Sequence, residues 1–389
     1  MISYIIPSHN NLRHLKNVYD SIQRNSPESE VILLDDASTD GTWEWIQEQD
    51  VISYKSPTRV GHTILYDKGI ELATNDIVGI LHADMIIGPN YTENVLKHLK
   101  EGTVVCGTRI EPPLHPAGKE KIIQDFGMDF DSLDVDAFET FCIEQQVTFD
   151  GQTTKGMFAP WVIYKSDFVS MGGHDPLFAP FPFEDSDIFQ RWILAGYELI
   201  QSRDAFVYHL TCRGHRWTEE IGKDDDYFQV ATNKAQRNYL RKWGTWIQND
   251  EYQHPIVPPK YDIEYKLVNA SQLTLSVLEP LCDRICVDLT QEQVDDYIKL
   301  EQQNTLFDLS KKVTVNDTFD SDIIVEIDGN KLSNQTINLL QQLPHIIKDS
   351  GGIGKFKIDT FEVTIKKLNQ YQNYLTTLTD KYYSEKLLT

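Results

Sequence analysis

The stretch GILHADMIIGPN, residues 79–90, places a histidine and an aspartate directly after an apolar run that is typical of a buried strand. His82 and Asp84 are therefore expected at the tip of that strand, and a second apolar pair, Ile86-Ile87, follows them. An aspartate in this place either caps the next turn or holds a ligand, because open α/β sheets bind ligands at the carboxyl ends of their strands. The rest of the sequence favours the second interpretation.

The composition is that of a globular protein and limits the classes of partner. Of the 389 residues, 40% are hydrophobic and 24% are charged, and a chain of this length is expected to form more than one domain. With 36 Lys and Arg against 59 Asp and Glu, the formal net charge is −23. This charge disfavours nucleic acids and anionic membranes as partners, because both bind basic faces.

Neither a membrane segment nor a secretion signal is predicted. No apolar run reaches the roughly 18 residues that a membrane-spanning helix needs. The N-terminal stretch MISYIIPSHN lacks the basic part and the long apolar part of a signal peptide. The five cysteines are scattered, which is typical of reduced thiols. We therefore expect a cytoplasmic protein with no integral membrane segment.

The first 110 residues alternate between strand and helix patterns. Apolar runs predict strands over 2–6, 31–34, 51–54, 77–81 and 103–106. Helical spacing predicts helices over 12–22, after Asp40, over 61–72 and over 91–99. Strands that alternate with helices indicate βαβ units, and continuous apolar strands indicate burial on both faces. The predicted fold class is therefore α/β, with a mostly parallel sheet flanked by helices.

Beyond residue 110 the pattern is less regular. Residues 111–155 are dense in acidic and aromatic side chains, and we expect a solvated, partly ordered excursion there. Regular structure then returns. Strands are predicted over 162–164, 198–200 and 205–208, and helices from Ser166 to Gly172, over 185–195 and over about 224–243.

The segment HPIVPPK, residues 254–260, is predicted to be a rigid linker between two domains. Residues 1–253 then form the first domain, and residues 261–389 form a smaller α+β domain. In the smaller domain, strands are predicted over 263–268 and 323–327, and helical stretches over 332–347 and 361–388. No catalytic motif falls there, so its role stays open between acceptor binding, homo-oligomer contacts and support of the first domain.

Acidic and imidazole side chains follow several of the predicted strands. Asp35-Asp36, Asp84 and His209 each come after an apolar run, and Glu184-Asp185 opens a helix. Taken singly, each has a structural explanation, such as helix capping or a favourable charge at a helix N-terminus. Because the carboxyl ends of parallel strands share one edge, the groups are expected to converge, and convergence favours a functional site.

Five stretches of the chain together resemble a family 2 glycosyltransferase with a GT-A fold. They cover about residues 2–210 and leave residues 255–389 unmatched. The stretches are IIPSHNN at 5–11, LLDDASTDGT at 33–42, RVGHTILYDKGIELATNDIVGILHADM at 59–85, MGGHDPLFAPFPFEDSDIFQRWILAGYEL at 171–199 and VYH at 207–209. The resemblance implies a nucleotide-diphospho-sugar as donor substrate.

The resemblance also implies roles for residues that would hold the donor. Pro7 would line the nucleoside pocket, and Asp36 would accept a hydrogen bond from the base, typically from uracil N3. Asp35 is the alternative for this contact. Apart from the resemblance, the stretch TCRGHRW at 211–217 is an isolated basic loop in an acidic chain, with Arg213, His215 and Arg216. We interpret it as a flexible lid over the pyrophosphate, with an ordinary basic surface loop as the alternative.

The resemblance further implies a divalent cation on the donor pyrophosphate. Asp84 matches the last acid of the DxD motif, and His209 matches an imidazole that supplies a second ligand. His82 and Ala83 stand where the motif has its first acid and middle residue, so the ribose contacts and the metal affinity depart from the family pattern. A mixed oxygen and nitrogen site favours Mn²⁺ over Mg²⁺.

For the chemical step, Asp185 matches the catalytic base of an inverting transfer, and Glu184 would orient the site or the acceptor. Three other residues have structural explanations that we prefer or weigh equally. Arg191 is expected to pair with an acid on its own helix and Asp175 to cap a turn, while Trp161 would either stack on an acceptor sugar or pack in the core.

The predicted function is an inverting, metal-dependent glycosyltransferase of the hexosyltransferase class. A UDP-sugar is the favoured donor, and a glycan, glycolipid or protein would supply the acceptor hydroxyl. A nucleotidyltransferase is disfavoured, because PSHNNLRHLK at 7–16 is not a glycine-rich phosphate loop. The alternative is a degenerate module of the same fold that binds glycans or serves a structural role without turnover.

Overall fold

The structure is a computed structural model that describes residues 1–214, 216–217, 220–315, 319–370 and 376–377. Two compact units make up the chain. The first holds Met1–Thr232, Asn249–Ile256 and Tyr374–Thr389, and the second holds Asn233–Gln248 and Val257–Asn373. The passage from Ile256 to Val257 falls inside the predicted linker, whereas residues 233–248 join the second unit although the predicted first domain contained them.

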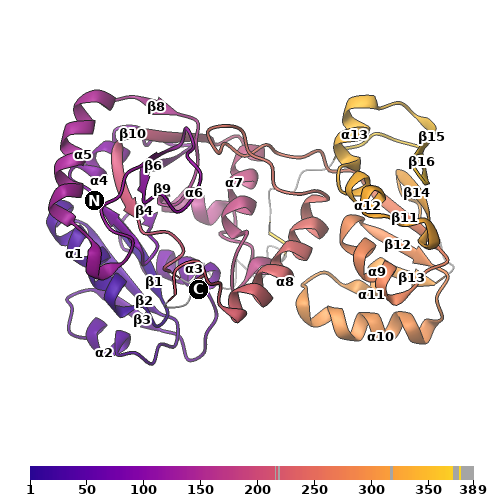
Figure 1. The fold of residues 1–389 in the computed structure, drawn as a ribbon, viewed down its shortest axis with the longest axis horizontal. Helices are drawn as coiled ribbons and strands as arrows, with labels where there is room; N and C mark the ends of the chain where they lie inside the picture. The colour runs from indigo at the N-terminus through magenta and orange to yellow at the C-terminus, as the bar shows by residue number, and fades with distance from the viewer. Residues whose placement is uncertain (215, 218–219, 316–318, 371–375, 378–389) are drawn as a thin grey trace. The chain divides into compact units, whose positions relative to one another are not determined.

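The first unit is built on a ten-stranded, mostly parallel sheet (Figure 1). Its strand order is β3-β2-β1-β4-β9-β6-β10-β5, with β7 beside β6 and β8 beside β10. The strands are β1 Ile2–Ser8, β2 Glu30–Asp35, β3 Ile52–Lys55, β4 Ile77–Ile80, β5 Met85–Ile87, β6 Thr103–Glu111, β7 Lys121–Ile123, β8 Thr153–Thr154, β9 Trp161–Tyr164 and β10 Glu198–His209. The α/β class and the mostly parallel sheet are as predicted.

In the described part of the chain, seven α-helices lie between these strands along the sequence, and an eighth follows β10 and continues into the second unit. They are α1 Leu12–Asn25, α2 Thr42–Ile46, α3 His62–Leu72, α4 Tyr91–Leu96, α5 Val135–Phe149, α6 Lys165–Ser170, α7 Glu184–Leu194 and α8 Asp226–Trp243. In α1, fully buried Leu15, Val18 and Ile22 lie on one face because they recur at helical spacing. Among the described residues, none of the helices has both the length and the apolar character that crossing a bilayer requires.

The second unit has a six-stranded sheet in the order β13-β12-β11-β14-β16-β15. Four neighbouring strands are parallel, and β16 and β15 are antiparallel to their neighbours. Helices and strands alternate along this unit, whereas only two strands and two helical stretches were predicted. Its elements are β11 Ile263–Val268, α9 Gln272–Leu278, β12 Arg284–Val287, α10 Gln291–Glu301, α11 Leu309–Lys312, β13 Val313–Val315, β14 Ile323–Asp328, α12 Asn334–Gln341, α13 Leu343–Ser350, β15 Gly354–Ile358 and β16 Phe361–Ile365.

Three expectations about local structure were wrong. The excursion at 111–155 contains the 15-residue helix α5, whose first turn is capped by the Asp134 carboxylate accepting from the N–H of Ala137. The two strands predicted over 198–200 and 205–208 are one strand, β10, with a shift of register inside it. The helix predicted over 361–388 is wrong where it is described, because residues 361–365 form β16 in a hairpin with β15; residues 371–375 and 378–389 lie outside the described residues.

The sheet of the first unit brings distant strand ends to one edge. β1 is parallel to β2 and β4, and β6 is parallel to β10. Because β9 runs antiparallel to both β4 and β6, these two groups point the same way. The carboxyl ends of β1, β2, β4, β6 and β10 therefore share an edge, and the candidate site is built there.

We expect Gly61→Ala to destabilise the protein more than Gly102→Ala. Both glycines have positive φ, 86° and 74°, where a non-glycine residue costs about 1–2 kcal/mol. A Cβ at Gly61 would also lie 2.3 Å from backbone atoms of Pro180, whereas a Cβ at Gly102 meets nothing within 4 Å. Urea unfolding followed by tryptophan fluorescence measures both losses. Equal losses would mean that the Pro180 backbone yields to the methyl group.

Candidate functional site

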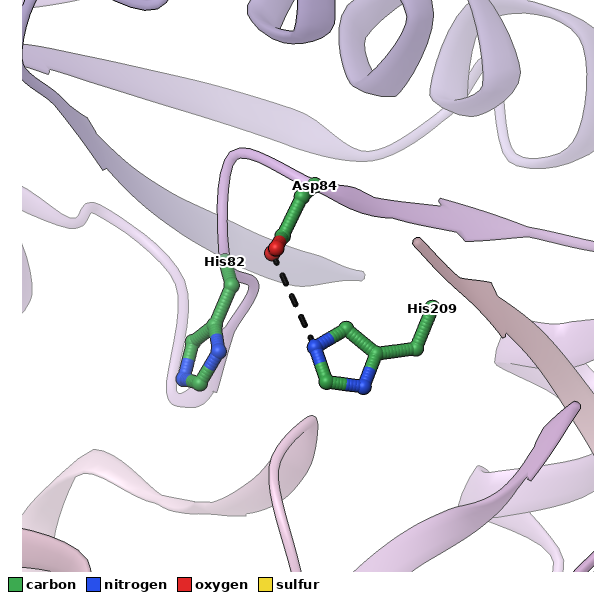
Figure 2. Close-up of side chains that lie close together, drawn as sticks. All are labelled: His82, Asp84 and His209. Atoms are coloured by element: carbon green, nitrogen blue, oxygen red, sulfur yellow. Dashed lines mark ion pairs between the residues drawn. The ribbon is translucent and has the colours of Figure 1, made fainter. Parts of the chain in front are cut away.

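His82, Asp84 and His209 form a cluster that could hold a metal ion, called here the metal cluster (Figure 2). Each offers one ligand atom, and these atoms lie within 4.8 Å of one another. His82 and Asp84 lie in the turn between β4 and β5, and His209 ends β10. Because β5 pairs antiparallel with β10, with Met85 opposite His209, the pairing itself brings the two segments together.

Asp84 is buried and held from two sides. Its Oδ2 accepts from the backbone N–H groups of Arg213 and Gly214, both at 2.9 Å. Its Oδ1 lies 3.8 Å from Nε2 of His209. Backbone donors thus fix one carboxylate oxygen while the other faces the imidazole, which is the orientation that a shared metal ion would need.

The two imidazoles of the metal cluster are in surroundings that suit metal binding. Burial lowers the pKa of His82 to about 4, so this ring is neutral at physiological pH, and only the neutral ring can donate a lone pair to a metal. Nδ1 of His209 lies 2.9 Å from Oε1 of Glu111, so its Nε2 is the nitrogen that faces Asp84.

Glu111 is a buried carboxylate in contact with three cationic or imidazole groups. Its Oε1 also accepts from Arg109 at 2.7 Å, and its Oε2 accepts from Lys121 at 2.7 Å. Burial by itself would raise the pKa of Glu111, but the hydrogen bond from His209 and the charge of Arg109 outweigh it and hold this pKa well below its usual range. Glu111 is therefore ionised.

A pocket beside the metal cluster contains four of the residues predicted to bind the donor. Pro7, Asp36, His82 and Ala83 line it, together with Arg59, His62, Tyr66 and other residues. Asp36 shapes the wall, because its two carboxylate oxygens accept from the N–H groups of Val60 at 2.7 Å and Gly61 at 2.9 Å. Each oxygen keeps a second lone pair for a ligand.

Asp35, the alternative to Asp36, does not line this pocket. It is fully buried at the end of β2. Its Oδ1 accepts from the N–H of Ser38 at 3.1 Å, and its Oδ2 lies 3.7 Å from Nζ of Lys55. These contacts are those of a residue that shapes the turn after β2.

Glu184 and Asp185 open α7, where Glu184 is buried and Asp185 is half-buried. Phe183, just before them, has a φ of 82°. Glu184 is paired with His62, whose Nε2 lies 2.7 Å from Oε1 of Glu184. His62 begins α3 and also lines the pocket. The acidic pair of α7 is thus joined to the pocket through an imidazole.

The two carboxylates of α7 differ in their affinity for protons. Burial raises the pKa of Asp185 well above its usual range, and the negative charge of Glu184 raises it further. Burial acts on Glu184 in the same direction, but the charge and hydrogen bond of His62 outweigh it and lower the pKa of Glu184. Glu184 carries the charge, while Asp185 exchanges its proton closer to neutral pH.

Arg213 contributes its backbone to the metal cluster and its side chain to a separate ion pair. Its guanidinium lies 2.5 Å from Oδ2 of Asp129, and its carbonyl accepts from the Asn11 side chain at 3.0 Å. Arg216 pairs with Asp224 at 2.8 Å. These contacts tie the stretch predicted as a flexible lid to its surroundings; His215 lies outside the described residues.

Two structural expectations near the site are confirmed, and of the two roles left open for Trp161 the structure shows core packing. Arg191 pairs with Asp187 one turn earlier on α7, at 2.7 Å. Asp175 caps a short 3₁₀ turn by accepting from the N–H of Leu177 at 3.0 Å. Trp161 is fully buried and packs edge-on against Trp192, with ring centroids 5.0 Å apart, so it belongs to the core and not to a sugar-stacking surface.

Sequence reasoning missed Glu111, His62 and Arg59. Glu111 has a usable signal, because it follows the apolar run of β6 just as the other acids follow theirs. His62 and Arg59 lie in the matched stretch 59–85, but no pattern within it distinguishes them from their neighbours.

Comparisons with known proteins agree with these motifs. Residues 3–162 match the model of glycosyl transferase family 2. A dolichol-phosphate mannosyltransferase from Pyrococcus furiosus is 27% identical over 118 residues, which are 28% of this chain and 33% of that protein. The match thus spans about a third of the length of this curated relative.

Two of the solved structures that match parts of this chain are glycosyltransferases. GalNAc-T7 with UDP, GalNAc and Mn²⁺ is 15% identical with a TM-score of 0.45, over 65% of this chain and 48% of that one. The mannosyltransferase PcManGT from Pyrobaculum calidifontis, in complex with GDP-Man and Mn²⁺, is 17% identical with a TM-score of 0.41, over 61% of this chain and 62% of that one. Residues 3–162 of this chain are thus similar to glycosyl transferase family 2.

Proposed function

We propose that this protein is a metal-dependent, inverting glycosyltransferase that moves a sugar from a nucleotide diphosphate to an acceptor hydroxyl. One observation carries the proposal. A cluster of metal-ligand type, a pocket with an acid in its wall and the acidic pair of α7 meet at one edge of the sheet. In this proposal, these parts would hold a leaving diphosphate, a nucleoside and an attacking hydroxyl.

The donor set of the metal cluster fits a divalent cation. His82, Asp84 and His209 would supply two imidazole nitrogens and one carboxylate oxygen. Nitrogen ligands suit Mn²⁺ better than Mg²⁺, which prefers oxygen. A bound cation would offset the negative charge that develops on the leaving diphosphate. Within this proposal, His82 replaces the missing first acid of the motif as a ligand.

Asp36 is our candidate for the contact with the base. Each of its oxygens accepts one backbone N–H and can accept a second donor, such as uracil N3–H. We therefore propose a UDP-sugar as donor. Pro7 and Ala83 line the same pocket beside it.

Asp185 is our candidate for the base that takes the proton from the acceptor hydroxyl. A general base works best when its pKa lies near the working pH, and burial beside ionised Glu184 moves Asp185 in that direction. Glu184, held by His62, would orient the acceptor or the base. The acceptor hydroxyl would belong to a glycan, a glycolipid or a protein, and the homo-oligomer through the second unit stays a prediction.

Calorimetry with UDP tests the donor site. We expect wild-type protein to bind UDP more tightly in the presence of Mn²⁺, and Asp84→Asn to lose that gain because it removes the single anionic ligand of the metal cluster. His82→Ala should weaken the Mn²⁺-dependent part about tenfold or more if this imidazole is a ligand. Asp134→Asn, which changes the exposed cap of α5, is the matched control.

Binding of UDP with equal strength with and without Mn²⁺ would contradict the metal-dependent part of the proposal. GDP is measured beside UDP in the same titrations. Tighter binding of GDP would contradict the proposed choice of base while leaving the transfer reaction standing.

A turnover assay with Asp185→Asn tests the base. We expect transfer from the UDP-sugar to fall by about 10²- to 10⁴-fold, with UDP binding unchanged, because the amide keeps the shape of the carboxylate and cannot take a proton. A wild-type protein that binds the donor but turns nothing over would favour the degenerate glycan-binding module instead.

The pH dependence of stability tests the ionisation of the acidic pair. A raised pKa in the folded state gives stability that is present below the ordinary carboxyl pKa, about 4, and is lost as the pH rises through the raised value. Asp185→Asn removes that loss, so at pH 8 we expect it to be more stable than wild type by about 1 kcal/mol or more, with the difference vanishing toward pH 4.

The neighbouring variant Glu184→Gln should behave in the opposite way. Its lowered pKa gives stability that is present above the ordinary carboxyl pKa and lost as the pH falls through the lowered value. It should therefore be less stable than wild type at pH 8. Urea unfolding of metal-free protein measures both variants, and a change of the same sign in the two would contradict the assignment of charge within the pair.

A further inference from the structure

Glu111 contacts a residue of the metal cluster from behind. It is the last residue of β6, and His209 is the last residue of β10. These strands are parallel neighbours with Ile110 opposite Tyr208, so the next residues of the two strands meet. Only 1% of the Glu111 side chain is exposed. The sheet itself thus fixes the contact between the two side chains.

We propose that Glu111 is a positioning residue of the metal site, which holds His209 with its proton on Nδ1 and its lone pair on Nε2. This inference rests on the proposed metal-dependent function. It extends that function beyond the three ligands to a residue that none of the matched motifs contains.

The hydrogen bonds of Glu111 decide which nitrogen of His209 carries the proton. Arg109 donates to Oε1 and Lys121 donates to Oε2, each at 2.7 Å. A carboxylate between two cations is ionised and can only accept. The 2.9 Å contact between Oε1 and Nδ1 of His209 therefore requires a hydrogen on Nδ1.

A neutral ring with its hydrogen on Nδ1 has its lone pair on Nε2. Nε2 is the atom that lies 3.8 Å from Oδ1 of Asp84, inside the metal cluster. A carboxylate behind a ligand histidine fixes the ring and its tautomer and raises the basicity of the donor nitrogen, and loss of such a partner typically weakens metal affinity 10- to 100-fold.

Glu120 provides a matched control for the charge of Glu111. It is also a buried glutamate, and its Oε1 lies 3.4 Å from the same Arg109 guanidinium. Within the described part of the chain, its side chain pairs with Arg109 and with no residue of the metal cluster. Glu120→Gln therefore removes a buried negative charge beside Arg109 without removing a contact of His209. If Glu111 had only a structural role, Glu111→Gln and Glu120→Gln would have the same effect on metal binding.

Binding of Mn²⁺ alone, followed by the electron paramagnetic resonance signal of the free ion, is the first measurement. We expect Glu111→Gln to weaken Mn²⁺ binding about 10- to 100-fold, and Glu120→Gln to stay within about twofold of wild type. Equal weakening by the two variants, or no weakening by Glu111→Gln, would overturn the inference. In either case the wild-type affinity still supports the metal site.

The tautomer of His209 is read separately in the metal-free protein. Two-bond ¹H–¹⁵N correlations of histidine-labelled protein at pH 8, with His209→Gln to assign the signals, should show Nδ1 protonated in wild type and a mixed or reversed tautomer in Glu111→Gln. If the wild type binds no Mn²⁺, the metal-dependent function fails while this spectrum still decides the inference. The same tautomer in both proteins would overturn it.

Discussion

The parallel register of five strands is the constraint on which the site depends. β1, β2, β4, β6 and β10 end at one edge, and their last residues are separated by up to 201 positions in the chain, from Ser8 to His209. Since a slip of one residue turns every side chain of a strand to the other face, the buried apolar runs that fix the register also fix His209 beside Glu111. The packing of the core therefore positions the side chains of the site.

Burying carboxylates at this edge costs desolvation free energy, and neighbouring donors and cations offset it. An ionised carboxylate removed from water needs donors or cations around it. Asp84 and Asp36 accept hydrogen bonds from backbone N–H groups. Glu111 is paired with Arg109 and Lys121. Glu184 is paired with His62. For Asp185, burial and the negative charge of neighbouring Glu184 raise the pKa. In a chain with a net charge of −23, basic side chains thus lie beside several of the buried acids at this edge.

Much of the first unit could be predicted from the sequence because strand ends and apolar runs are local signals. Asp36, Asp84 and His209 follow such runs, and the sheet brings them to one edge. Elements decided by pairing could not be read in the same way. Residues 361–365, FEVTI, alternate apolar and polar side chains, yet it is the hairpin with β15 that makes them a strand.

Helix α5 escaped prediction for a related reason. Phe138 and Cys142 are its only buried residues, so its sequence carries little of the apolar periodicity that marks a helix. His62 was missed because its role comes from a contact with Glu184, 122 residues away, which no local pattern reports. Local patterns find the acids of the site, while their partners come from tertiary structure.

The two halves of the site solve the same physical problem with histidine. Two adjacent carboxylates at the start of α7 cannot both be ionised cheaply in a buried place, and His62 assigns the charge to Glu184. At the metal cluster the relation is reversed, since ionised Glu111 assigns the proton of His209. The motif acids alone would leave the proton positions open. The imidazole contacts determine the proton positions. The lone pair on Nε2 of His209 then faces Asp84, and the carboxyl of Asp185 can accept a proton near neutral pH.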